Sequence, residues 1–151
     1  MTDMIKFAGA VVLVLLALMT LSFGRKDETL KELIARTEAA RPDQQPDLYM
    51  EAADRQRKAA ADAMKADHWE EFSVDLQDVV KYCDRAHAAA ISTNKHIKNT
   101  EIRIRRISSY LKDIKLDVEI DDQAKVQTAI DQLEQFRTDL MRKIFGGKSN
   151  D

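Results

Sequence analysis

Glycine and proline are almost absent from the body of this chain. The four glycines occupy positions 9, 24, 146 and 147, and the two prolines, Pro42 and Pro46, lie close together. Tight β-turns use Gly, Asn or Pro where the backbone takes a special conformation. A segment that contains no glycine from residue 25 to residue 145 therefore offers few places for a strand to reverse, and we expect an all-α fold.

The chain has a single cysteine, and its three histidines are far apart in sequence. Cys83 is the one cysteine, which excludes an intramolecular disulfide and a cysteine-based zinc site. We interpret it as a small apolar residue on a helix. The sequence also shows no nucleophile with an acid–base partner, and helical rods offer few clefts for one. We therefore predict no catalytic residue, no metal, no cofactor and no small-molecule substrate, so the chain is not expected to be an enzyme.

The one long hydrophobic run lies at the N-terminus. Residues 7–23, FAGAVVLVLLALMTLSF, carry no charge. Ser22 and Gly24 fit a cleavage site after Gly24, but the run is equally compatible with a retained membrane anchor, although seventeen helical residues span only about 26 Å. We expect residues 1–24 to be a signal peptide or membrane anchor, 25–146 a helical bundle domain and 147–151 a flexible tail. The folded part is expected outside the cytoplasm, periplasmic or otherwise exported, and either free or anchored in the inner membrane.

A hydrophobic heptad repeat is the strongest pattern in the sequence. Its first line is Trp69, Leu76, Cys83, Ala90, Ile97, Ile104, Leu111 and Val118, and its second is Phe72, Val79, Ala86, Thr93, Thr100, Ile107 and Ile114. Such a repeat is typical of a helix that packs against others along its length. We expect one helix over about residues 69–118, roughly 75 Å long, as the axis of an extended antiparallel helical bundle of coiled-coil type. The alternative is a break in the polar segment 92–101, STNKHIKNTE, where Asn99 or Thr100 would cap a second helix.

Three shorter helices are expected beside this axis. The first covers about residues 27–40 and ends before Pro42. The second begins near Pro46, and its buried stripe is expected to be Leu48, Ala52, Ala59 and Ala63, with Met64 beside it. The last begins at Asp121 or Asp122 and ends at Gly146-Gly147. Its apolar face comprises Val126, Ala129, Ile130, Leu133, Phe136, Leu140 and Ile144.

The segment KADHWEEF, residues 65–72, joins the second helix to the heptad helix. We interpret it as the tip of a helical hairpin, in which Asp67 is the N-cap and Glu70 and Glu71 complement the positive end of the helix dipole. The alternative hypothesis is a metal site formed by Asp67, His68 and Glu71, although all three side chains can point to water.

Residues 59–86 resemble the helix-turn-helix unit of tetratricopeptide repeats. Ala60 stands where those units have a small residue, Trp69 matches the aromatic residue after their turn, and Trp69-Glu70-Glu71 coincides with their acidic run. Phe72 stands where alanine is usual, and no second copy follows at a period of about 34 residues. The resemblance implies helix-hairpin packing and protein binding, and it implies no particular binding residue.

Charge is unevenly distributed along the chain. Residues 27–78 contain fourteen acidic and seven basic side chains, whereas residues 79–115 contain nine basic and three acidic ones. In the heptad register a basic stripe lies opposite the apolar lines, and it consists of Lys98, Arg105, Arg106 and Lys112. The stripe is either a solvated face that pairs with the acidic helices or a site for anionic lipid or an acidic partner. Nucleic acid is not expected, since the net charge is −2.

These observations predict a non-catalytic helical protein, exported or tethered to the membrane through residues 7–23. We expect it to act as a protein-interaction or structural module of the cell envelope, with another envelope protein or a second copy of itself as partner. Ile102 and Leu116 lie off the heptad lines and are the candidate contact residues. The alternative hypothesis is a binder of anionic lipid or other phosphate surfaces through Lys98, Arg105, Arg106 and Lys112.

Overall fold

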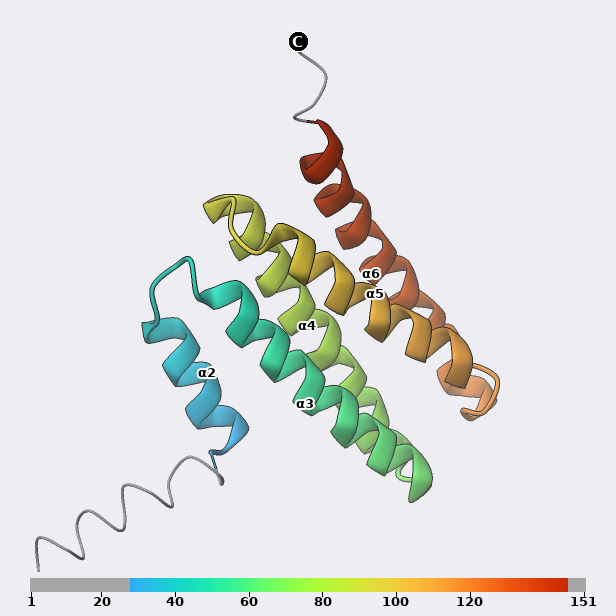
Figure 1. The fold of residues 1–151 in the computed structure, drawn as a ribbon. Coiled ribbons are helices and arrows are strands. Elements are labelled where there is room, and N and C mark those ends of the chain that lie inside the picture. Colours follow the sequence, from blue (N-terminus) through green and yellow to red (C-terminus); the bar gives the residue numbers. More distant parts are fainter. Residues whose placement is uncertain (1–27, 147–151) are drawn as a thin grey trace, which may run out of the picture. The chain divides into compact units, whose positions relative to one another are not determined.

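The computed structural model describes residues 28–146, and these residues are almost entirely helical (Figure 1). The helices are α2 (Leu30–Ala39), α3 (Gln45–Lys65), α4 (Trp69–Thr93), α5 (Ile97–Ile114) and α6 (Ile120–Phe145). None of the residues from 28 to 146 forms a strand, so the predicted all-α class is confirmed. The predicted signal or anchor at 7–23 and the predicted tail at 147–151 lie outside the described residues.

The chain divides into two units, residues 1–32 and 33–151. Within residues 28–32 of the first unit, Thr29 and Glu32 form a reciprocal pair of hydrogen bonds. The backbone N–H of Glu32 donates to Thr29 Oγ1 at 3.1 Å, and the backbone N–H of Thr29 donates to Glu32 Oε2 at 3.3 Å. This capping box satisfies two N–H groups that a helix start leaves unpaired. It explains why α2 begins at Leu30 rather than at the expected residue 27.

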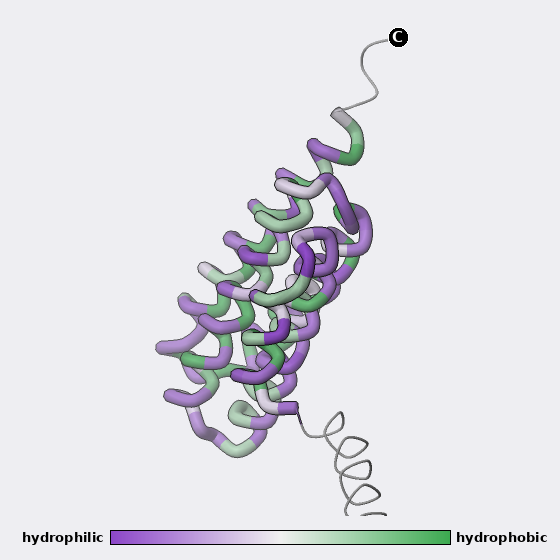
Figure 2. The backbone as a smooth tube through the Cα atoms, turned by 90° about the vertical axis from the view of Figure 1, so that its left-hand side faces the viewer, coloured by the Kyte–Doolittle hydropathy of each residue, from purple (hydrophilic) through white to green (hydrophobic). Residues whose placement is uncertain are grey.

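In the second unit, helices α3 to α6 form two antiparallel hairpins (Figure 1). Helix α3 packs against α4, and α5 packs against α6. The hairpins meet because α4 contacts α6 and α3 contacts α5. Since the chain reverses at every connection, α4 and α6 run parallel, as do α3 and α5, whereas α4 and α5, which are also in contact, run antiparallel. Hydrophobic and hydrophilic residues alternate along each of these helices (Figure 2), as burial of one face requires.

The predicted continuous helix over 69–118 is wrong, because the chain turns back between α4 and α5. Asn94 and His96 both adopt left-handed backbone conformations, with φ of 56° and 58°. An L-residue in this conformation cannot continue a right-handed helix, and Asn tolerates it better than most. The alternative of a break in 92–101 is therefore the one the structure contains. The second helix starts at Ile97, and Asn99 and Thr100 lie inside it instead of capping it.

The heptad lines nevertheless identify the buried residues of both helices. Every member is buried except Trp69, Thr93 and Ile97, which are half-buried. The two exceptions at 93 and 97 flank the turn. Folding back brings both halves of the apolar seam into one four-helix core, whereas a single rod would extend its second half away from α3. The largest fully buried side chains include Phe72, Met50, Ile104, Ile107, Leu111, Leu133 and Leu140.

The buried stripe of α3 differs in part from the predicted one. Ala52 and Ala63 are buried as expected, but Leu48, Ala59 and Met64 are only half-buried. The other buried side chains of this helix are Pro46, Tyr49, Met50, Ala53 and Ala60. Hydropathy favoured Leu48, yet alanines make up much of the buried stripe, because small side chains let α3 approach α4 closely. On α6 the predicted face is buried except for Phe136 and Ile144, which are half-buried.

The KADHWEEF segment is the tip of the α3–α4 hairpin, but Asp67 does not cap α4. Asp67 has φ of 56°, and its N–H donates to the carbonyl of Met64 at 3.2 Å. The N–H of His68 donates to the carbonyl of Ala63 at 2.9 Å. These two bonds make a Schellman motif, so Asp67 ends α3 and His68 occupies the N-cap position of α4. The prediction for Asp67 was wrong because short polar residues such as Asp and Asn are favoured at N-caps and are also tolerated in the left-handed position that ends a helix.

Candidate functional site

The four basic residues of the predicted stripe are all exposed on α5, but Arg106 has different neighbours from Arg105 and Lys112. Arg105 Nε lies 3.9 Å from Glu101 Oε1, and Lys112 Nζ lies 3.1 Å from Glu134 Oε1 of α6. Arg106 instead lines a pocket shared with α3. Lys98 and Arg106 make no ion pair with another residue of 28–146. The stripe is therefore divided between the α6 side and the α3 side of α5.

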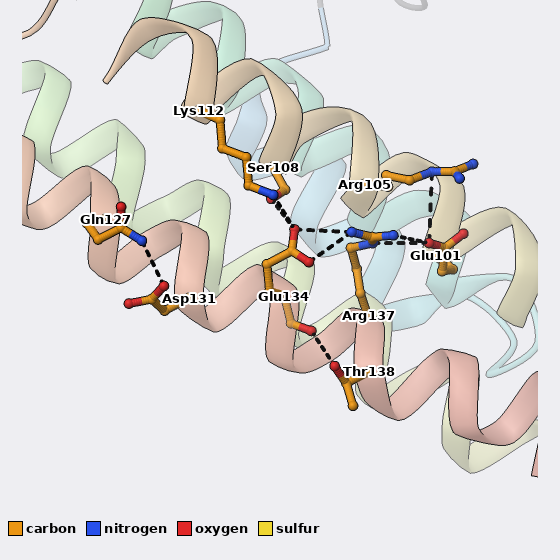
Figure 3. Close-up of polar contacts among 9 residues, drawn as sticks. All are labelled: Glu101, Arg105, Ser108, Lys112, Gln127, Asp131, Glu134, Arg137 and Thr138. Atoms are coloured by element: carbon orange, nitrogen blue, oxygen red, sulfur yellow. Dashed lines mark hydrogen bonds and ion pairs between the residues drawn. The ribbon is translucent and has the colours of Figure 1, made fainter. Parts of the chain in front are cut away.

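A polar network links α5 to α6 around Arg137 (Figure 3). The Arg137 guanidinium donates to Glu101 Oε1 from Nε at 3.1 Å and from Nη2 at 3.0 Å, and its Nη1 donates to Glu134 Oε2 at 2.9 Å. Ser108 Oγ donates to Glu134 Oε1 at 2.6 Å. Burial raises the pKa of Glu134, but hydrogen bonds from Ser108, Lys112 and Arg137 outweigh it and hold this pKa below its ordinary value. Each carboxylate is thus paired, and we interpret the network as a structural clamp between the two helices.

A pocket of about 380 Å³ lies between α3 and α5. We call it the α3/α5 pocket, and it is lined by Asp54, Arg57, Lys58, Arg103, Arg106, Ile107 and Tyr110. Arg103 is fixed by Asp54, whose Oδ2 accepts a hydrogen bond from Nη2 at 2.7 Å, and by the carbonyl of Asp47 at 3.3 Å. Four cationic side chains therefore meet one carboxylate.

The aromatic side of the α3/α5 pocket is formed by Tyr110. The Arg57 guanidinium carbon lies 5.1 Å from the centre of the Tyr110 ring, within range of a cation–π interaction. Burial raises the pKa of the Tyr110 hydroxyl, and the charge of Arg57 partly opposes this shift. Arg106 was predicted from the sequence as part of a basic face, whereas Arg57 and Lys58 were not. The available signal was that these two form the only adjacent basic pair in the acidic segment 27–78.

A second candidate surface follows the parallel helices α4 and α6. It contains two hollows, of about 490 Å³ and about 960 Å³, and we call it the α4/α6 face. The first hollow is lined by residues from Ser73 to Asp84 and from Lys125 to Phe136, and the second by residues from His87 to Asn94 and from Asp139 to Gly146. Neither hollow was anticipated from the sequence.

The α4/α6 face has an aromatic pair where the two hollows meet. His87 stacks on Phe136 with ring centres 5.1 Å apart. Its Nε2 lies 3.3 Å from Asp139 Oδ2 and its Nδ1 lies 3.9 Å from Asp84 Oδ1. Neither ring nitrogen makes a hydrogen bond of acceptable geometry, although both are buried. Half-buried aromatic rings beside surface hollows can lose further exposed area under a bound partner, and aromatic residues are enriched at protein interfaces.

The predicted contact residues Ile102 and Leu116 differ in accessibility. Leu116 is 80% exposed, whereas Ile102 is half-buried. Ile120, the first residue of α6, is 81% exposed and was not predicted as a contact residue from the sequence. Its helical position at the start of α6 could have been found from the acidic first turn of Asp121 and Asp122.

The remaining candidate residues form no reactive centre in the part of the chain that the structure describes. Cys83 is fully buried, and this burial raises the pKa of its thiol far above the usual range. At the hairpin tip, His68 Nδ1 lies 3.4 Å from Glu71 Oε2 on the surface. From residue 28 to residue 146, no three His, Cys, Asp or Glu side chains are grouped so that they could hold a metal ion.

Comparisons with protein-family models, with curated proteins and with solved structures gave no match for this chain. Among the helices that lie within residues 28–146, none has the combination of length and apolarity needed to cross a membrane.

Proposed function

We propose that this chain is a non-catalytic helical protein, exported or tethered through residues 7–23, that docks another protein of the cell envelope on its α4/α6 face. The occupant is one amphipathic helix with acidic flanks. The observation that carries the proposal is the pair of hollows along two parallel helices, with the half-buried Phe136 between them. Tetratricopeptide-like binding by the 59–86 hairpin is compatible with this role, because α4 supplies one wall.

The length and lining of the α4/α6 face support a helix as the occupant. On α4 the two hollows extend from Ser73 to Asn94, which corresponds to roughly 30 Å of helix. Val80, Ile91 and Phe136 are half-buried there, so each would lose further exposed apolar surface under a docked helix. An amphipathic helix laid along a groove uses this combination of aliphatic side chains and one central aromatic anchor.

Charge complementarity supports an acidic partner. The cations at the edges of the two hollows are Lys81, Lys125, Arg142 and Lys143, against the carboxylates Asp84 and Asp139. Asp139 is already engaged by Arg142, whose Nη1 lies 3.5 Å from Asp139 Oδ1. Lys81 and Lys125 are likewise paired, with Asp78 at 3.0 Å and with Asp122 at 2.8 Å. Lys143 makes no ion pair within residues 28–146, and it would attract an acidic residue that flanks the apolar face of a partner helix.

Site-specific photocrosslinking of the full-length chain in its native membrane tests this proposal. A photoreactive residue is introduced at Ala88 or at Gln132, which are exposed at the two hollows, and at Ser109, which is exposed on α5, as the matched control. We expect one partner protein from both hollow positions and none from Ser109. Crosslinks to a second copy of the chain, or equal yields at all three positions, would contradict the proposal.

A measurement with the purified partner then tests the charge argument. Lys143→Glu in the full-length chain should weaken binding by roughly threefold to tenfold, because it reverses a rim charge. Lys65→Glu makes the same charge change at the exposed end of α3 and should leave the affinity unchanged. Equal affinities for the two variants would show that the partner does not use the basic rim.

Binding to anionic lipid or another phosphate-bearing surface through Lys98, Arg105, Arg106 and Lys112 is a second candidate function. The observation that favours it is that Lys98 and Arg106 have no ion-pair partner within residues 28–146, although Lys112 shares its charge with Glu134. Co-sedimentation of the full-length chain with neutral and with anionic vesicles separates this role from insertion of residues 7–23, which neutral vesicles also permit. A salt-sensitive excess on anionic vesicles that Lys98→Gln reduces is expected, and equal sedimentation contradicts it.

A further inference from the structure

The α3/α5 pocket concentrates positive charge from two helices that are distant in sequence. Arg57 and Lys58 come from α3, and Arg103 and Arg106 come from α5. Asp54 is the one acidic side chain in the lining, so the four cations and one carboxylate give the pocket a formal charge of +3. Like charges gathered in a concave site repel one another more strongly than on a flat surface, because the surrounding protein lowers the local dielectric.

The cations of the α3/α5 pocket differ in how firmly they are held. Asp54 and the carbonyl of Asp47 fix Arg103, and the ring of Tyr110 supports Arg57. Arg106 and Lys58 are exposed and make no ion pair with any residue from 28 to 146. The pocket therefore contains two positioned guanidinium groups, those of Arg103 and Arg57, and two cations that are available to an incoming anion.

We propose that the α3/α5 pocket binds a phosphate monoester group attached to an apolar or aromatic organic part. Arg106 and Lys58 close on the phosphate, and Arg57 supplies the guanidinium fork that matches two phosphate oxygens. Tyr110 and the buried Ile107 form an apolar side of the pocket, where the organic part of the ligand lies. A volume of about 380 Å³ accommodates a small phosphorylated compound or the head of a phosphate-bearing lipid.

This site is distinct from the α4/α6 face and from the network around Arg137. Arg105 and Lys112 belong to the α6 side of α5, where carboxylates of Glu101 and Glu134 compete with any external anion. Arg106 is the one member of the predicted basic stripe that lines the pocket. Loss of phosphate binding therefore leaves partner docking on the α4/α6 face unaffected, and the two proposals can fail separately.

Calorimetric titration of the full-length chain in neutral detergent tests the site with phenyl phosphate as the probe. We expect saturable binding with a Kd of about 1 mM or tighter, weakened by added salt. Inorganic phosphate should bind more weakly because it makes no contact with Tyr110, and phenol should not bind. Arg106→Gln should weaken phenyl phosphate binding roughly tenfold or more, since it removes a charge-assisted hydrogen bond.

Arg105→Gln is the matched control, because it makes the same change at the next position of the same helix but on the α6 side. It should alter the Kd by less than about twofold, and thermal unfolding should show that both variants remain folded. Binding that is unsaturable, or that the two variants reduce equally, would overturn the proposal.

Vesicles distinguish the two sources of the phosphate group. In phosphatidylcholine vesicles containing phosphatidic acid, a lipid ligand predicts that the reconstituted chain no longer binds phenyl phosphate, because the lipid phosphomonoester occupies the pocket. A soluble ligand predicts that phenyl phosphate binds equally well in pure phosphatidylcholine and in the mixed vesicles. Either result is consistent with the phosphate site and identifies the source of the phosphate group. For a lipid ligand, Arg106→Gln should abolish the competition by phosphatidic acid. For a soluble ligand, Arg106→Gln should abolish the binding of phenyl phosphate. Competition that persists in Arg106→Gln would overturn the assignment to this pocket.

Discussion

Removal of the Arg137 guanidinium should destabilise the bundle far more than removal of the guanidinium of an exposed surface arginine. In Arg137→Met the apolar part of the side chain is kept while the guanidinium is lost. Glu101, whose side chain is 6% exposed, then keeps Arg105 at 3.9 Å as its one cationic partner among residues 28–146. Glu134 loses its bidentate partner but retains Ser108 and Lys112 (Figure 3). The main loss therefore falls on the buried carboxylate of Glu101.

The magnitude follows from the exposure of the partners. Breaking a fully buried ion pair by removing one member costs about 3–5 kcal/mol, because an uncompensated charge is left in the interior. The Arg137 side chain is 21% exposed, so water and Arg105 recover part of this loss. We expect a decrease in the free energy of unfolding of about 2–3 kcal/mol. The Arg142 side chain is 72% exposed, and its Nη1 lies 3.5 Å from Asp139 Oδ1. Arg142→Met should therefore lower the free energy of unfolding by less than about 0.5 kcal/mol.

Guanidinium chloride unfolding of the full-length chain, followed by the helical circular dichroism signal, measures both values. The double variant Glu101→Gln/Arg137→Met should recover part of the loss, because the orphaned charge has been removed together with its partner. Two results would refute the interpretation of this network as a clamp. One is that Arg137→Met lowers the free energy of unfolding no more than Arg142→Met does, and the other is that the effects of the two changes in the double variant are additive.

Three further predictions concern the turn, the pH dependence and the thiol. Asn94→Val should lower the free energy of unfolding by about 1–2 kcal/mol relative to Asn94→Gly in chemical denaturation, because position 94 requires φ of 56°. The folded-state pKa of Glu134 lies below its unfolded value of 4.5, so its contribution is present above that pH and is lost as the pH falls through the folded-state pKa. Stability of the wild type should therefore decline more steeply than that of Glu134→Gln between about pH 5 and pH 3, as measured by unfolding curves at each pH. Cys83 should resist thiol reagents in the folded protein and react at the rate of unfolding, and fast labelling under native conditions would contradict its burial.

The sequence alone determined the fold class and most of the buried residues. A glycine-free body excluded tight hairpin turns, and the 3.5-residue period from Trp69 to Val118 identified apolar positions that lie inside the bundle. Both are local properties, because backbone preference and side-chain spacing act within a few residues. The same local signals were ambiguous at Asp67, since a polar residue between two helices can end the first or begin the second.

Tertiary structure decided the direction of the chain and the composition of each candidate site. A heptad pattern is identical in one long helix and in two consecutive helices joined by a turn, so only the left-handed turn at Asn94 and His96 distinguishes them. The α3/α5 pocket unites Arg57 with Arg106, and the α4/α6 face unites His87 with Phe136. These pairs lie about fifty residues apart in sequence, and helix periodicity carries no information about which faces of separate helices meet. That choice depends on the packing of small and large side chains across the whole core.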